Sequence, residues 1–129
     1  MPSPSDSSRV LVVDDEADLT ATYVRLLELH GYRAVAAGTR RDALTIIERE
    51  PLVLVISDVR LPDGDGLDVV RAATAAPSHP AAIVITGFSS EATRLAALEA
   101  GASAYFAKPF SASRLMAAVR DLSFPSPPA

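Results

Sequence analysis

The chain has 129 residues, 49% of them hydrophobic, and a net charge of −4 because 16 acidic residues outnumber 12 basic ones. The length and composition fit one globular domain, and the acidic balance argues against direct binding to nucleic acid. The sequence contains no Cys, which excludes disulfides, thiolate metal sites and cysteine nucleophiles.

The ends of the chain predict its boundaries and its location. Residues 1–8 and 123–129 are rich in Pro and Ser. We therefore expect a disordered N-terminal tail, a folded domain over 9–122, and a Pro-rich tail or the start of a linker. The first residues lack the apolar segment of a signal peptide, and no apolar run approaches the roughly 20 residues of a membrane span. We expect a cytoplasmic protein that has no membrane partner.

Between the ends, short apolar runs alternate with amphipathic segments. The run RVLVV is rich in Val, as buried parallel strands are, and LVLVI repeats this pattern. In the first amphipathic segment, Leu19, Tyr23 and Leu27 recur on one face of a helix, and Gly31 ends the pattern. In chain order, strand and helix are expected alternately over residues 9–13, 16–31, 32–38, 39–50, 52–58, 66–76, 81–87, 89–101, 103–107 and 111–122.

Cap residues support the helix boundaries. Thr39 is the expected N-cap of helix 39–50, and Ser89 or Ser90 is the expected N-cap of helix 89–101, which Gly101 ends. Strict alternation of apolar strands with helices predicts an α/β fold, a doubly wound five-stranded parallel sheet with helices on both faces. With the strands counted in chain order, right-handed crossovers allow the flavodoxin-like order 2-1-3-4-5. In that order a ligand crevice lies at the carboxyl ends of the first and third strands.

Polar residues collect at the predicted carboxyl ends of the strands. Asp14 and Asp15 follow the first strand, Asp58 ends the third, Thr86 ends the fourth, and Lys108, the only Lys in the chain, follows the fifth. Close carboxylates repel by about 4 kcal/mol per pair at an effective dielectric constant near 20, so the cluster needs a compensating cation. Lys108 is one such cation, and a divalent ion that prefers oxygen ligands, Mg²⁺ or Mn²⁺, is the other.

Each of these residues also has an explanation without function. Asp14 or Asp15 could cap the following helix, and Asp58 could form a turn. Thr86 is a typical β-branched strand residue, and Tyr105 is most simply a half-buried aromatic. The site hypothesis depends on the coincidence of these signals at one edge of the sheet.

With these residues identified, the sequence resembles the receiver domain of two-component response regulators. VLVVDDE is similar to the acidic pair of that family, and ISDVRLPDGDGLDVV to its phosphoacceptor segment. IVITG is similar to its threonine segment and GASAYFAKPF to its lysine segment. The four motifs occur in order, and the resemblance extends over residues 9–122.

The resemblance implies roles for the clustered residues. Asp58 would accept a phosphoryl group from a histidine kinase or a phosphotransfer protein. Asp15, Asp58 and the backbone carbonyl of Arg60 would bind Mg²⁺ directly, and Asp14 would act through a water on the metal. Lys108 would contact the acceptor carboxylate and then the phosphoryl group, and its peptide bond to Pro109 would be cis.

The resemblance also implies a switch. Thr86 would donate its hydroxyl to the phosphoryl group, and Tyr105 would follow by turning inward. The face formed by 89–101, 103–107 and 111–122 would contact an output domain or protein, and a phosphorylation-dependent homodimer remains open. Candidate contributors to this face are Glu91, Arg94, Leu95, Ala102 and Arg114.

Arg60 and Phe88 are expected to flank the acceptor pocket and to shield the phosphoryl group from water, which predicts slow dephosphorylation.

A receiver is not a turnover enzyme, because it catalyses only its own phosphorylation and dephosphorylation. One alternative is a haloacid-dehalogenase-like phosphatase, although that family expects a D-x-D pattern after the first strand, where this chain has DDE. The other is a flavodoxin-like cofactor binder, which needs a Gly- or Ser-rich phosphate loop at this position.

Overall fold

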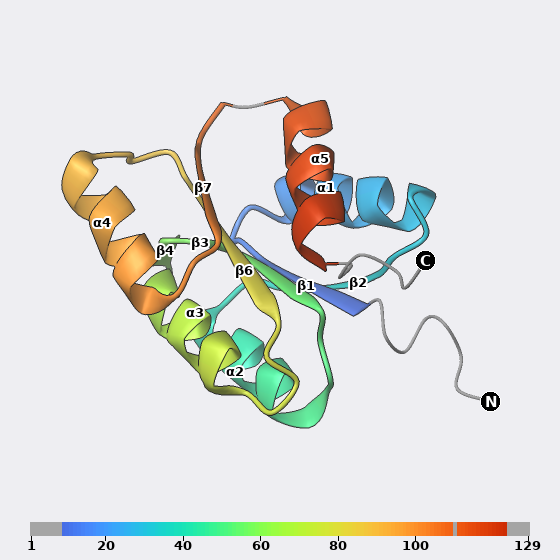
Figure 1. Cartoon of the computed structure of the whole chain (residues 1–129), viewed down its shortest axis with the longest axis horizontal. Helices are drawn as coiled ribbons and strands as arrows, with labels where there is room; N and C mark the ends of the chain where they lie inside the picture. Colours follow the sequence, from blue (N-terminus) through green and yellow to red (C-terminus); the bar gives the residue numbers. More distant parts are fainter. Residues whose placement is uncertain (1–8, 110, 124–129) are drawn as a thin grey trace.

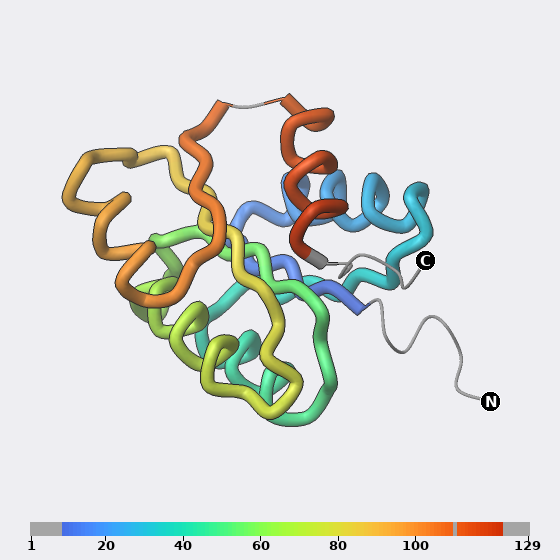
Figure 2. Tube along the Cα trace, viewed as in Figure 1, coloured from blue at the N-terminus to red at the C-terminus, as the bar shows by residue number. Residues whose placement is uncertain are grey.

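The computed structural model describes residues 9–109 and 111–123. The expected tail at 1–8 and most of the expected C-terminal tail lie outside the described residues. Ser123, which was expected to begin that tail, is instead the last residue of a helix. Figure 1 shows the strands gathered in one layer with helices on both sides. The trace in Figure 2 returns to this layer after each helix except the last.

The main sheet has five parallel strands, which are β1 (Arg9–Val13), β2 (Arg33–Ala37), β3 (Leu54–Asp58), β6 (Ala81–Thr86) and β7 (Ala104–Ala107). Their order across the sheet is β2-β1-β3-β6-β7. This is the predicted order 2-1-3-4-5 once the strands of the main sheet are counted in chain order, so the predicted fold is confirmed.

Four helices connect these strands, and a fifth follows the last strand. They are α1 (Ala17–Leu29), α2 (Arg40–Arg49), α3 (Gly66–Ala75), α4 (Glu91–Ala100) and α5 (Ala112–Ser123). A short antiparallel ribbon, β4 (Arg60–Leu61) and β5 (Gly64–Asp65), lies between β3 and α3 and was not predicted. None of the described helices is long and apolar enough to cross a bilayer.

The core lies on both faces of the sheet. Along β1, Val10 and Val12 pack with α1 and α5 on one face, while Leu11 and Val13 pack with α2 and α3 on the other. All four side chains are fully buried, as expected for a parallel strand covered on two sides. Ala102, expected on the output face, is only 8% exposed and packs with α3, β6 and α4. Ala102 therefore offers little surface to a partner on that face.

The helix starts confirm two predicted caps and reject another. The Thr39 side chain accepts a hydrogen bond from the backbone N–H of Asp42 and caps α2, and Ser90 caps α4 through Thr93. The N-cap of α1 is Glu16, and neither Asp14 nor Asp15 caps this helix. Helix capping therefore does not explain the presence of Asp14 and Asp15 after β1.

Candidate functional site

The carboxyl ends of β1 and β3 bring the predicted acids together. These strands pair in parallel with Val13 opposite Ser57, so that Asp14 and Asp58 each stand next to that pair along their own strands. One carboxylate oxygen of each of Asp14, Asp15 and Asp58 lies within 4.8 Å of the others. The side chains of Asp14 and Asp58 are 0% and 10% exposed, whereas Asp15 is exposed to solvent. The predicted acidic cluster is therefore present.

Lys108 reaches this cluster from β7, on the other side of β6. Its Nζ donates to Asp14 Oδ2 at 2.9 Å and to Asp58 Oδ2 at 3.1 Å. Glu16 Oε1 lies 3.8 Å from the same nitrogen. The Lys108–Pro109 peptide bond is cis, as the resemblance implied. One ammonium thus bridges two carboxylates that would otherwise repel.

The protonation of Lys108 follows from these contacts. Burial lowers the pKa of the Lys108 ammonium, but the hydrogen bonds that the ammonium donates to Asp14 and Asp58 outweigh this effect and raise the pKa from 10.5 to about 12. Because the folded-state pKa exceeds the unfolded value, this contribution to stability is complete below pH 10.5 and is lost as the pH rises through 12. Lys108 is therefore charged throughout the neutral range.

The second oxygens of the two buried acids are also held in place. Asp14 Oδ1 accepts from the backbone N–H of Glu16 at 3.0 Å, and Asp58 Oδ1 accepts from the backbone N–H of Arg60 at 3.2 Å. Each carboxylate is therefore oriented by one amide and by the shared ammonium. A reaction that depends on the position of its reacting groups requires carboxylates that are held in a fixed orientation in this way.

Thr86 and Tyr105 lie on neighbouring strands. Thr86 is fully buried at the end of β6, and its Oγ1 accepts from the backbone N–H of Phe88 at 3.0 Å. The half-buried Tyr105 donates its hydroxyl to Ser89 Oγ at 2.9 Å, in the loop between β6 and α4. Both predicted switch residues therefore contact the same loop.

The Arg60 side chain stacks on the Phe88 ring. The Arg60 guanidinium carbon lies 3.8 Å from the centroid of the Phe88 ring, a cation–π distance, and Phe88 is 61% exposed. The sequence predicted that these residues flank the site but not that they stack. This stack connects β4 to the loop after β6.

The sequence interpretation missed Gly66. A Cβ atom at Gly66 would lie 1.7 Å from the backbone oxygen of Asp58, which no side chain could tolerate without a shift of the main chain. The Gly66 N–H donates to the carbonyl of Val59 at 2.6 Å. The signal was present in the DGDG segment, where a glycine eight residues after the acceptor allows close backbone approach.

The donor set of the cluster fits a hard divalent cation. Three carboxylates face one ammonium, which leaves an excess of negative charge that a divalent ion offsets. All the nearby ligand atoms in the cluster are oxygens, which favour Mg²⁺, Ca²⁺ or Mn²⁺ over zinc. The residues present therefore fit a divalent metal.

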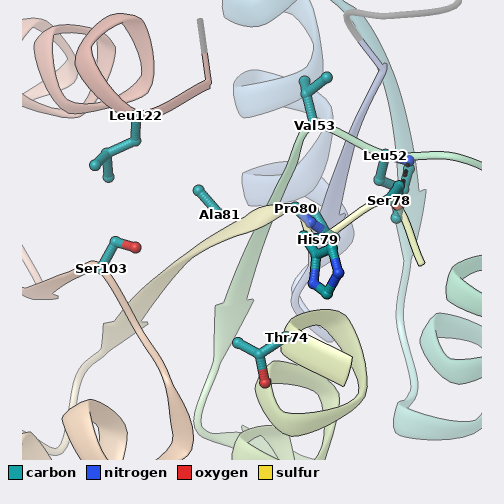
Figure 3. A pocket seen from close by; sticks show the side chains of 9 residues that line it. All are labelled: Leu52, Val53, Thr74, Ser78, His79, Pro80, Ala81, Ser103 and Leu122. Atoms are coloured by element: carbon teal, nitrogen blue, oxygen red, sulfur yellow. Dashed lines mark hydrogen bonds between the residues drawn. The ribbon is translucent and has the colours of Figure 1, made fainter. Parts of the chain in front are cut away.

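A surface cavity lies away from this cluster. It has a volume of about 540 Å³ and lies beside residues 52–53, which precede β3, and residues 78–81, which lead into the first residue of β6 (Figure 3). Thr74, Ser103 and Leu122 complete its lining, which contains no carboxylate and no lysine. This cavity lacks the charged groups of the acidic cluster and lies at the amino-terminal ends of the strands.

Known proteins match this chain over most of its length. The transcriptional regulatory protein PrrA of Mycobacterium tuberculosis is 39% identical over 117 residues, covering 90% of this chain and 50% of PrrA. A CheY-like receiver domain protein from Methanospirillum hungatei has a structure with a TM-score of 0.84, 31% identity, and coverage of 88% and 91% of the two chains.

A response regulator from Burkholderia pseudomallei gives a TM-score of 0.79 at 30% identity, with coverage of 86% of this chain and 65% of that one. Its structure contains a phosphorylated aspartic acid, a calcium ion and citrate. These relatives give no support to the phosphatase alternative. This chain spans about half the length of the curated relatives it matches.

A family model also matches this chain, over a range that includes the residues at the carboxyl ends of the strands. The model of the response regulator receiver domain matches residues 10–120, which include the acidic cluster, Thr86 and Lys108. This chain belongs to the response regulator receiver domain family.

Proposed function

We propose that this chain is a phosphoacceptor switch in which Asp58 takes a phosphoryl group from a histidine kinase or a phosphotransfer protein. The observation that carries the proposal is the Lys108 bridge between Asp14 and Asp58, with N–O distances of 2.9 and 3.1 Å, in a chain of the receiver family. The phosphorylated aspartic acid in the B. pseudomallei relative supports the same chemistry.

The transfer requires a nucleophile and nearby positive charge. A carboxylate oxygen of Asp58 forms a bond to phosphorus while the bond from phosphorus to the donor nitrogen or oxygen breaks, and the electron pair leaves with the donor. The Lys108 ammonium, already 3.1 Å from Asp58, offsets charge on the phosphoryl oxygens. The Thr86 hydroxyl accepts a bond from Phe88 and keeps its own proton to donate to a phosphoryl oxygen.

The acidic cluster is the proposed Mg²⁺ site, at which Mn²⁺ can substitute. Asp15, Asp58 and the Arg60 backbone carbonyl would hold the ion directly, and Asp14 would hold it through water. When bound, the ion supplies positive charge that neutralises the phosphoryl oxygens. The three carboxylates within 4.8 Å of one another support this assignment.

Phosphorylation would be read out on the face of α4, β7 and α5. The modification adds a charge of about −1.5 to −2 beside Thr86, which draws the Thr86 hydroxyl inward and lets Tyr105 leave Ser89. On this face Leu95 is 48% exposed, and Arg94 donates to Glu91 at 3.1 Å. These features fit contact with an output domain or protein, or with a second copy of the chain.

The proposal is tested by incubation with acetyl phosphate and Mg²⁺, followed by intact mass measurement. We expect at most one added phosphoryl group per chain, a gain of about 80 Da, and no labelling when EDTA removes the metal. A protein that takes up no phosphoryl group would contradict the proposal. Continuous release of many equivalents of phosphate per chain would instead support the phosphatase.

Phe88→Ala is expected to speed hydrolysis of the phosphorylated chain by about two- to fivefold, the range given by one exposed cation–π contact. The Phe88 ring supports the Arg60 guanidinium at 3.8 Å, and its loss would open the acceptor pocket to water. The decay of the phosphorylated mass after removal of acetyl phosphate measures this rate. Leu95→Ala, which removes an exposed apolar side chain from α4, is the matched control, and equal rates in all three proteins would reject the shielding role.

A further inference from the structure

The N-terminus of α2 is capped from outside the helix. Among its first backbone N–H groups, Asp42 donates to the Thr39 side chain, as in an ordinary N-cap. The N–H groups of Arg40 and Arg41 donate instead to Asp63, at 2.7 Å to Oδ1 and 3.0 Å to Oδ2. Asp63 lies between β4 and β5, 23 and 22 residues along the chain from its partners. These backbone hydrogen bonds lower the pKa of the Asp63 carboxyl, which stays ionised near neutral pH.

The Arg40 side chain also contacts the segment around the ribbon, at Gly64 and Asp68. Its Nε donates to Asp68 Oδ2 of α3 at 2.9 Å. On its way there it crosses Gly64, where a Cβ atom would lie 2.7 Å from Arg40 Cδ. Arg40 therefore binds Asp63 with its main chain and covers Gly64 with its side chain. The turn of the β4–β5 ribbon is held between α2 and α3.

This ribbon fixes the main chain next to the acceptor. Its two pairs are Arg60 with Asp65 and Leu61 with Gly64. Arg60, two residues after Asp58, donates its N–H to Asp58 Oδ1 and is proposed above to offer its carbonyl to the metal. A shift of the turn at Asp63 would be transmitted through the ribbon to that carbonyl. Residues that orient metal ligands in this way tune metal affinity.

We infer that Asp63 and Arg40 are positioning residues that set the Mg²⁺ affinity of the acceptor site by anchoring the β4–β5 ribbon to α2. This inference rests on the proposed function. Asp63 is exposed and lies at the turn of the ribbon, outside the acidic cluster of Asp14, Asp15 and Asp58, so its effect would act through the ribbon and not through direct coordination.

The test is a Mg²⁺ titration of the ¹⁵N-labelled full chain, without phosphodonor, followed by amide NMR. Loss of a direct outer-shell partner of a metal ligand commonly lowers metal affinity by about 10- to 100-fold. Asp63 acts one contact further away, through the ribbon, so Asp63→Ala should raise the Mg²⁺ dissociation constant by up to about tenfold. Asp63→Asn keeps one acceptor oxygen for the α2 amides and should give a smaller increase.

Thr39→Ala is the matched control because it removes a cap from the same helix terminus without touching the ribbon. If Asp63 acts only by stabilising α2, Thr39→Ala and Asp63→Ala will shift the dissociation constant equally, and the inference is overturned. An Asp63→Ala protein with the wild-type constant also overturns it. If Asp63→Ala does not fold, a wild-type constant in Asp63→Asn overturns the inference. A wild-type chain whose amides near Asp58 do not respond to Mg²⁺ rejects the proposed function as well, which separates the two failures.

Discussion

Asp58→Asn will take up no phosphoryl group from acetyl phosphate under conditions that label the wild-type chain. An amide has no anionic oxygen to attack phosphorus, and no other carboxylate of the cluster has the same pair of contacts to Lys108 and the Arg60 amide. The expected result is complete loss of the added mass of about 80 Da. Labelling of Asp58→Asn to the wild-type level would assign the phosphoryl group to another residue.

The loss is not expected to come from unfolding. Removing the Asp58 charge loses an attraction to Lys108 at 3.1 Å but also removes repulsion from Asp14 and Asp15. These effects oppose each other, so we expect the free energy of unfolding to change by less than about 1 kcal/mol. Denaturant unfolding measures this. Asp42→Asn, which removes an exposed acid from the first turn of α2, should stay fully labelled.

Lys108→Ala should destabilise the metal-free protein more than Asp58→Asn or Arg71→Ala does. The substitution leaves Asp14, whose side chain is 0% exposed, and Asp58 without their shared cation. Breaking a buried ion pair in this way costs about 3–5 kcal/mol, and the 19% exposure of Lys108 places the expected loss near 3 kcal/mol. Unfolding by urea in EDTA measures the loss.

Mg²⁺ should restore more stability to Lys108→Ala than to the wild type, because the ion then supplies the only strong positive charge in the cluster. Arg71→Ala is the control, since Arg71 makes an exposed ion pair with Asp68 at 2.9 Å, worth about 0–1 kcal/mol. Equal losses in Lys108→Ala and Arg71→Ala would show that the bridge contributes little to folding. Equal stabilisation of Lys108→Ala and wild type by Mg²⁺ would show that the ion does not substitute for the ammonium, and no stabilisation of either protein would argue against a metal in the cluster.

The sequence predicted the features that follow from periodicity and handedness. The Val-rich runs at β1 and β3 are buried on both faces, and the parallel order then places Asp14 beside Asp58. Lys108 was singled out as the only Lys in the chain, and its bridge to both acids follows from the place of β7 beside β6. These predictions need only the arrangement of strands.

Features that depend on side-chain packing between distant elements were not predictable in the same way. The ribbon β4–β5 has two-residue strands, which are too short to show a period. The bond from Arg40 to Asp68 depends on how α2 and α3 pack, and the burial of Ala102 depends on how the chain enters β7. The strand expected over 52–58 begins at Leu54, two residues later than the apolar run predicts.

The functional groups are distributed over four strands, and this distribution has a consequence for synthesis of the chain. Asp14 and Lys108, which form one ion pair, are 94 residues apart in sequence. A nascent chain that has completed β1, β3 and β6 still lacks its ammonium, and the acids would face each other without it. Competence to receive a phosphoryl group therefore arises only when the last strand is added, so an incompletely translated chain would be silent in signalling.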